Sequence, residues 1–219
     1  MKNPLLPLIF LAFLSLPATA LAGTFTFSPS PSDLGDLDHH MVYTWQISGL
    51  AVPAGQLITS AKITFNNIAN WDGNHNVLYI HLLDSAKWAG VNSFQDDPFD
   101  SDFTDDFANA RFHSLSSWLT VNSPTPTLDT YLTTYVDLPT TPQTLVYNFT
   151  AAQLAALASY IANGGDIALG FDPDCHFFNT GVTFQYTTTP VPEPATMLLL
   201  GTGLSFGGMY LRKRRQQQN

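Results

Sequence analysis

The stretch 144-TLVYNFTAAQLAALASYIANGGDIALGF-171 holds two predicted strands on either side of the clearest predicted helix in the chain. The flanking runs, Thr144–Phe149 and Asp166–Phe171, are rich in the β-branched and aromatic residues that favour strands. The stretch therefore indicates a mainly β domain with one inserted helix.

The helix is predicted from its two ends and from its apolar spacing. Thr150 followed by Gln153 forms a capping box, which satisfies free backbone N–H groups of the first turn. Apolar residues then fall at helical spacing from Leu154 to Ile161, and Asn163-Gly164-Gly165 supplies a left-handed end. We predict a helix over 151–163 that plugs one end of the fold or packs on one sheet.

Runs of similar strand-forming composition recur between turn signals through residues 23–190. Their spacing predicts an antiparallel β-sandwich of seven to nine strands and leaves jelly-roll and immunoglobulin-like connections open. The predicted strands are Thr24–Phe27, Met41–Ser48, Ile58–Ile68, Val77–Leu83, Thr130–Val136, Thr144–Phe149, Asp166–Phe171 and Val182–Thr188.

Two connecting segments carry weaker predictions. Asp72–Asn76 has the first half of a calcium-loop spacing but lacks that loop's glycine and glutamate, so a hairpin turn is the simpler interpretation. From Phe94 to Val121 the pattern is poor. We expect a long acidic loop there, with one short helix around Phe107–Leu115.

The N-terminal end of the 219-residue chain has the pattern of a secretory signal peptide. Residues 1–22 begin with Lys2, continue through the apolar run Leu5–Leu16 and end in small residues. We predict that signal peptidase cuts after Ala22, with a cut after Ala20 as the alternative. The domain would then comprise residues 23–190.

That domain is strongly acidic. Its sixteen Asp and no Glu face only Lys62, Lys87 and Arg111, which gives a formal net charge of −13 with His neutral. Nucleic-acid binding is excluded as a function, because phosphate contacts need Lys and Arg. A cation or a neutral, hydroxyl-rich partner fits this charge better. The single cysteine, Cys175, excludes an internal disulfide.

The tail, residues 191–219, combines three elements in order. An uncharged stretch of 17 residues, Ala195–Leu211, would form a helix of about 25 Å at ~1.5 Å per residue, near the short limit for crossing a bilayer. Basic residues stay on the cytoplasmic side, so the domain should lie on the opposite, outer side of the membrane. The stretch is preceded by Val191, Pro192, Glu193 and Pro194 and followed by Arg212, Lys213, Arg214 and Arg215.

This tail resembles the PEP-CTERM sorting signal of exported proteins in Gram-negative bacteria that make extracellular polysaccharide. The resemblance rests on the motif at 191–194, the predicted transmembrane helix at 195–211 and the basic stop at 212–215. It implies that an exosortase, a membrane transpeptidase, cleaves near the motif and releases or re-attaches the protein. The precursor would be anchored in the inner membrane, and the mature protein would lie at the cell surface or outside the cell.

The segment 171-FDPDCHF-177 contains the group of polar residues in the domain that most suggests a binding site. If it is extended, Asp172, Asp174 and His176 share one face and could bind a metal, while Cys175 faces the core. Asp-Pro-Asp is equally a common turn sequence, and both interpretations stay open. The segment resembles a GFDPDCHF segment of uncharacterised exported domains that carry the same tail.

Six carboxylates lie within eleven residues of the predicted acidic loop. Ca²⁺ prefers hard oxygen ligands and would relieve the repulsion among them, whereas a solvated loop without metal is the alternative. The carboxylates belong to Asp96, Asp97, Asp100, Asp102, Asp105 and Asp106.

The aromatic residues favour binding over catalysis. Trp71, beside a predicted turn, is the tryptophan most expected to be exposed and to stack on a sugar ring, whereas Trp45 should lie in the core. A glycosidase needs two carboxylates at a defined separation, and sixteen Asp single out no pair. We expect a non-catalytic surface or matrix protein associated with extracellular polysaccharide, with Ca²⁺ as its candidate ion. A secreted carbohydrate-active hydrolase using paired Asp residues is the alternative.

Overall fold

Antiparallel strands make up most of the structure, a computed structural model that describes residues 21–95, 103–108, 129–191 and 201–203. Ala22–Pro190 forms one compact unit. Its helix is α2 (Ala151–Gly164), and its strands among the described residues are β1 (Gly23–Phe27), β2 (Met41–Ile47), β3 (Gln56–Asn70), β4 (Val77–Leu83), β5 (Gly90–Gln95), β6 (Asp129–Val136), β7 (Gln143–Asn148), β8 (Ile167–Pro173), β9 (Phe177–Phe178) and β10 (Gly181–Pro190).

The strands form two sheets, with the orders β1-β10-β3-β7 and β5-β2-β8-β4-β6, and β9 pairs with the end of β3. Four antiparallel pairs are nested in the chain: β4 with β6, β3 with β7, β2 with β8, and β1 with β10. Such nesting is a long hairpin wrapped into two sheets, which is the connection of a jelly roll. The topology therefore decides between the two sandwich connections that the sequence leaves open.

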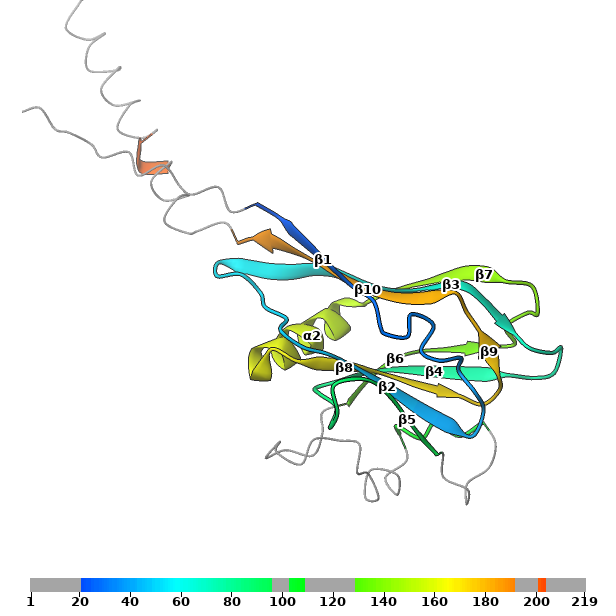
Figure 1. Cartoon of the computed structure of the whole chain (residues 1–219). Coiled ribbons are helices and arrows are strands. Elements are labelled where there is room, and N and C mark those ends of the chain that lie inside the picture. The colour runs from blue at the N-terminus through cyan, green and yellow to red at the C-terminus, as the bar shows by residue number, and fades with distance from the viewer. Residues whose placement is uncertain (1–20, 96–102, 109–128, 192–200, 204–219) are drawn as a thin grey trace, which may run out of the picture. The chain divides into compact units, whose positions relative to one another are not determined.

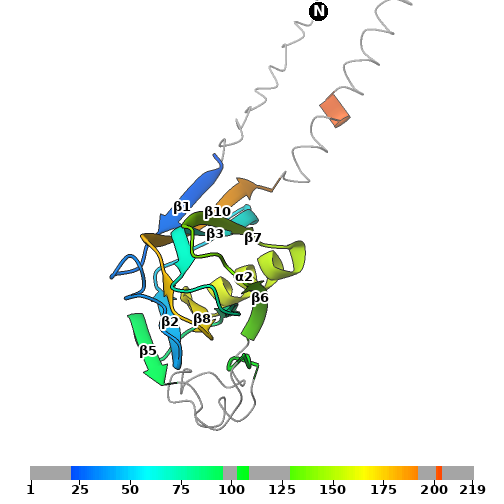
Figure 2. The ribbon, with the colours of Figure 1, turned by 90° about the vertical axis from the view of Figure 1, so that its right-hand side faces the viewer.

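One hydrophobic core lies between the two sheets. Phe65 of β3 meets Phe171 of β8 across the sheets, with ring centroids 5.8 Å apart in an edge-to-face arrangement. Figure 2 shows β1, β10, β3 and β7 as one layer and β5, β2, β8 and β6 as the other. Trp45, on the core face of β2, is buried as predicted.

Helix α2 begins and ends as the sequence predicts. Thr150 and Gln153 form the capping box, and Gly165 takes the left-handed conformation at the C-terminal end, with φ 77°. The side-chain amide of Gln153 also donates to the backbone carbonyls of Tyr131 and Leu132 in β6, both at 3.0 Å. The helix contacts β3 in one sheet and β6 and β8 in the other, so it plugs one end of the sandwich (Figure 1).

Three predictions need correction. Asp72–Asn76 is not a hairpin turn, because β3 before it and β4 after it belong to different sheets. Phe94 lies in strand β5 and not in a loop, and its strand is held by pairing with β2. The described part has ten strands, since β5 and the two-residue β9 were not predicted.

Two predicted helices fall largely on residues that the structure does not describe. Of Phe107–Leu115, only the first two residues are described, and Phe107 lies in a turn. Of the predicted transmembrane helix 195–211, only Gly201–Gly203 is described, as helix. Among the described residues, no helix has both the length and the apolar character needed to span a bilayer.

Both ends of the domain lie at the same end of the strands of the first sheet. Gly23 at the start of β1 pairs with Thr188 of β10, and Pro190 at the end of β10 pairs with Gln56 at the start of β3. β3 then runs for 15 residues to its far end beside β9, and its first and last Cα atoms are about 45 Å apart at ~3.3 Å per step. Figure 1 shows α2 near the first end of β3 and β9 at the other.

Candidate functional site

The residues of the sorting signal lie mostly outside the described part of the chain. Val191 follows directly on β10 and is exposed. Ala22, the predicted cleavage residue, is exposed just before β1, so a cut there would leave β1 intact. The predicted residues outside the described part are Ala20, Pro192, Glu193, Pro194, Arg212, Lys213, Arg214 and Arg215.

The structure does not bring together the predicted metal ligands Asp172, Asp174 and His176. The chain bends directly after β8, so the extended backbone that a shared face requires is interrupted in this segment. The carboxylate of Asp172 accepts a hydrogen bond from the backbone N–H of Asp106 at 2.8 Å, whereas His176 Nδ1 lies 3.1 Å from Asp38 Oδ1. The described residues contain no group of three or more His, Cys, Asp or Glu that could hold a metal ion.

The remaining predicted calcium ligands, Asp96, Asp97, Asp100 and Asp102, lie outside the described residues. Calcium binding by this acidic segment therefore stays a prediction. The last two residues of this set, Asp105 and Asp106, are described. The Asp105 carboxylate contacts His81 of β4, and the backbone N–H of Asp106 donates to the Asp172 carboxylate of β8.

A buried ion cluster forms on the outer face of the sheet that contains β4 and β8. His81, in the middle of β4, is only 1% exposed. Its Nδ1 lies 2.8 Å from Asp129 Oδ1, and its Nε2 lies 3.0 Å from Asp105 Oδ2. Because carboxylates only accept hydrogen bonds, both ring nitrogens must donate, which makes His81 an imidazolium. The cluster joins β4, the start of β6 and the segment 103–108.

The carboxylates of Asp105 and Asp129 stabilise the protonated form of His81 and so raise its pKa. Burial by itself lowers the pKa of His81, but the hydrogen bonds and negative charges of Asp105 and Asp129 outweigh burial and raise the pKa to about 9. The ordinary value is about 6.5. The charged form is therefore more stable in the folded protein than in the unfolded chain.

Domain stability should consequently depend on pH between these two pKa values. A raised folded-state pKa contributes stability that is fully present below about pH 6.5 and is lost as the pH rises to about 9. We expect urea midpoints to fall across this range in the wild type and to stay flatter in His81→Gln. If the urea midpoint changed equally with pH in the two proteins, His81 would not be the group that causes the pH dependence.

The cluster fastens the segment 103–108 onto the sheet. Asp105 Oδ1 also accepts from the backbone N–H groups of Phe107 (3.1 Å) and Ala108 (3.2 Å). The Phe107 ring stacks on His81, with centroids 4.9 Å apart. The Tyr79 hydroxyl donates to the Phe103 carbonyl at 2.8 Å. Since the imidazole is buried and both its nitrogens are engaged, this arrangement holds structure and does not present a reactive group to solvent.

A second site lies at the far end of β3, where Trp71 and Phe178 line a groove of about 630 Å³. Trp71 is 61% exposed and Phe178 is 47% exposed. The two residues are far apart in the sequence. They meet because Phe178 in β9 pairs with Ala69, two residues before Trp71, near the end of β3. We call this site the Trp71 groove; its other lining residues are Asn67, Ala69, Asn70, Thr140, Pro142, Asn179 and Thr180.

Contacts with His176 fix the positions of both aromatic residues. The backbone N–H of Trp71 donates to the His176 carbonyl at 3.0 Å. The His176 ring packs on the Phe178 ring, with centroids 4.5 Å apart. The next turn is fixed by the Asp72 carboxylate, which accepts from the backbone N–H of Asn74 at 2.9 Å. The two rings therefore belong to a supported surface.

Asn70 supplies a buried polar group to this groove. It is 2% exposed, and its side-chain Nδ2 donates to the Asp72 carbonyl at 2.9 Å. Its buried Oδ1 accepts no hydrogen bond from the described residues. Chemically, the groove offers flat apolar rings beside amide and hydroxyl groups.

Only part of the Trp71 groove was predictable. Trp71 was predicted to be exposed from its place beside a turn, and this is confirmed. Phe178, Asn70 and Thr180 were missed, because the pairing of β9 with β3 that assembles them leaves no local pattern. His81 was missed as well, although a lone histidine in the apolar strand 77-VLYIHLL-83 is a signal for a buried polar group that needs partners.

Comparison with known proteins identifies the tail. Residues 190–215 match the sequence model of the PEP-CTERM protein-sorting motif. No curated protein matches the chain. Among solved structures, recombinantly expressed latent aurone synthase, a polyphenol oxidase, is similar over 72% of this chain and 26% of its own, with 8% identity and a TM-score of 0.33. The chain thus spans about a quarter of the length of that structure.

Proposed function

We propose that this chain, whose C-terminal tail carries a PEP-CTERM sorting motif, is a non-catalytic surface protein that binds neutral saccharides in the Trp71 groove. In this account signal peptidase removes residues 1–22, and the stretch 195–211 holds the precursor in the inner membrane of a Gram-negative cell. An exosortase then acts at residues 191–194. The mature domain meets extracellular polysaccharide outside the cell.

The observation that carries the saccharide proposal is a pair of exposed aromatic rings in a groove that is also lined by amide and hydroxyl side chains. Trp71 and Phe178 offer flat faces on which sugar rings stack. Amide and hydroxyl side chains of the lining, among them Asn179 and Thr180, can exchange hydrogen bonds with sugar hydroxyls. A groove of about 630 Å³ lies within the range of ligand sites, which are mostly apolar with a few placed polar groups.

Charge supports a neutral saccharide over an acidic one. The domain has a formal net charge of −13, and no Lys or Arg is among the described residues that line the groove. A polymer of uronic acids would meet repulsion with no cation to offset it. Neutral hydroxyl-rich chains avoid that cost.

The same lining supports binding without hydrolysis. Glycoside hydrolysis generally needs two carboxylates flanking the scissile bond. The described residues that line the Trp71 groove include no Asp, Glu or His. The neighbouring Asp72 is engaged by Asn74 in the turn. The groove can therefore hold a sugar but supplies no acid–base pair.

The test is the affinity of Trp71→Ala for the neutral polysaccharide shed by the producing cells, measured by titration calorimetry. A central aromatic anchor is worth about 1.4 kcal/mol or more, so we expect the dissociation constant to rise at least about tenfold. Trp88→Ala is the matched control, since Trp88 is also exposed but packs against Phe94, away from the groove. Equal affinities for the two variants would place the sugar elsewhere.

A further inference from the structure

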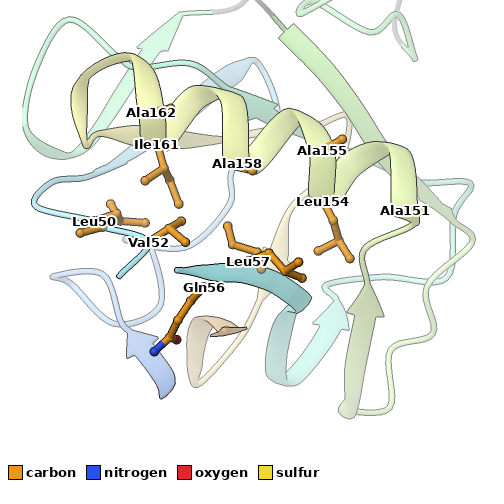
Figure 3. Close-up of a pocket in the computed structure, with 12 residues that line it drawn as sticks. Leu50, Val52, Gln56, Leu57, Ala151, Leu154, Ala155, Ala158, Ile161 and Ala162 are labelled. Carbon is orange, nitrogen blue, oxygen red and sulfur yellow. The ribbon is translucent and has the colours of Figure 1, made fainter. Parts of the chain in front are cut away.

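A second, almost wholly apolar groove lies between α2 and the first residues of β3. It has a volume of about 710 Å³, and eleven of its twelve lining residues are Ala, Val, Leu or Ile. Figure 3 shows Leu154, Ala155 and Ala158 on the helix side, opposite Leu57 and Val52. Gln56 is the only lining residue with a polar side chain. We call this site the helix groove.

The groove exists because small residues of α2 face a large exposed one of β3. Ala151, Ala155, Ala158 and Ala162 recur at helical spacing and do not fill the space above the strand. On the opposite wall Leu57 is 45% exposed. Side chains alternate between the two faces of a strand, so Leu57 points outward while its neighbour Ile58 is buried in the core. Apolar side chains that face solvent in this way mark a contact surface.

The last residues of β10, from which the sorting tail continues, pair with two residues that line this groove. Pro190 pairs with Gln56 and Thr189 pairs with Leu57, so the last residues of β10 lie one strand away from the lining. Four residues, Val191–Pro194, separate Pro190 from Ala195, where the uncharged stretch starts. The five residue-to-residue steps from Pro190 to Ala195 span at most about 17 Å when fully extended. An anchored tail therefore keeps the helix groove close to the bilayer surface.

We propose that the helix groove is a membrane-contacting surface, occupied by acyl chains of the outer leaflet while the tail is still attached. The inference rests on the proposed anchoring of the precursor by residues 195–211. Tethering raises the effective concentration of lipid at the groove to the order of millimolar, so a modest apolar contact suffices. A second copy of the domain fits less well, because two domains of charge −13 repel one another.

This contact would orient the domain. The helix groove lies at the first end of β3, and the Trp71 groove lies at the far end, about 45 Å along the strand. Lipid contact at the first end turns the Trp71 groove away from the membrane. The tethered precursor would then present its saccharide site outward before the exosortase acts.

The experiment measures quenching of a fluorescent label by spin-labelled lipid. The full chain with Cys175→Ala and Ala155→Cys is labelled with nitrobenzoxadiazole and reconstituted in phosphatidylcholine vesicles that contain doxyl-phosphatidylcholine. Val136→Cys is the matched control, because Val136 is exposed at the end of β6 that pairs with Val77, away from α2. We expect at least about twofold stronger quenching at position 155 than at 136, reduced to the control level by Leu57→Asp.

Each outcome bears on the inference. Equal quenching at the two positions in a precursor that floats with the vesicles overturns the lipid contact and leaves the anchoring intact. A blue-shifted label at 155 without quenching means that protein, not lipid, covers the groove, and also overturns it. A precursor that fails to float with the vesicles overturns the anchoring and this inference together. None of these results changes the saccharide proposal, which is tested on the separate groove.

Discussion

Replacing His81 by alanine is expected to lower the free energy of unfolding of the domain by about 3–5 kcal/mol. His81 is buried, and both its ring nitrogens lie within 3.0 Å of carboxylate oxygens. Without the imidazolium, Asp105 and Asp129 keep their negative charges in a largely buried site with no cation between them. Removing one partner of a buried ion pair costs this much because the other charge stays desolvated and unpaired. Urea denaturation of residues 23–190 measures the loss.

The matched control is His75→Ala. His75 Nδ1 lies 2.7 Å from Asp137 Oδ1, so the contact has the same chemistry, but both side chains are more than half exposed. Exposed ion pairs contribute about 0–1 kcal/mol. A His81→Ala variant that loses no more stability than His75→Ala would show that the buried cluster is not what fastens the segment 103–108.

Gly170→Val is expected to destabilise the domain by about 3 kcal/mol, through overpacking. A Cβ atom at Gly170 would stand 2.5 Å from Phe107 Cζ and 2.7 Å from Cε1, well inside contact distance. Phe107 cannot easily move away, because it is buried and its ring stacks on His81. Overfilling a packed site costs about 1–3 kcal/mol, and valine adds more than the Cβ alone. Thermal unfolding of residues 23–190 measures this loss of stability.

Removing the obstructing ring should reverse much of this loss. In the Gly170→Val, Phe107→Ala double variant, the new side chain occupies space that the ring leaves, so the two costs should not add. Gly73→Val is the control, since no atom lies within 4 Å of a Cβ at Gly73 and its surface turn can accept one. Strict additivity of the two changes would mean that Phe107 does not pack on Gly170 in solution.

Most strands were predictable because their signals are local. The apolar and aromatic runs predicted eight of the strands near their observed positions, and Val77–Leu83 to the residue. The capping box predicted α2 for the same reason. β5 was missed because 90-GVNSFQ-95 has little strand-forming composition and is held by pairing with β2. β9 has only two residues and exists through its pairing with β3.

Properties that depend on distant contacts could not be predicted. Jelly-roll and immunoglobulin-like sandwiches share the same local alternation, and only the nesting of β1 with β10 around the other pairs separates them. The shared face of Asp172, Asp174 and His176 assumed an extended chain, whereas the chain bends after β8. Asp105 and Asp129 meet His81 from 24 and 48 residues away, a spacing that no motif encodes.

Titration calorimetry of the wild-type domain, residues 23–190, with extracellular polysaccharide measures saccharide binding directly. The polymer is taken from the producing cells and separated by anion exchange into a neutral and an acidic pool. We expect saturable binding of the neutral pool and none of the acidic pool, because the described lining of the Trp71 groove offers rings and hydroxyl partners but no cation. Binding of the acidic pool, or of neither pool, would contradict the saccharide proposal.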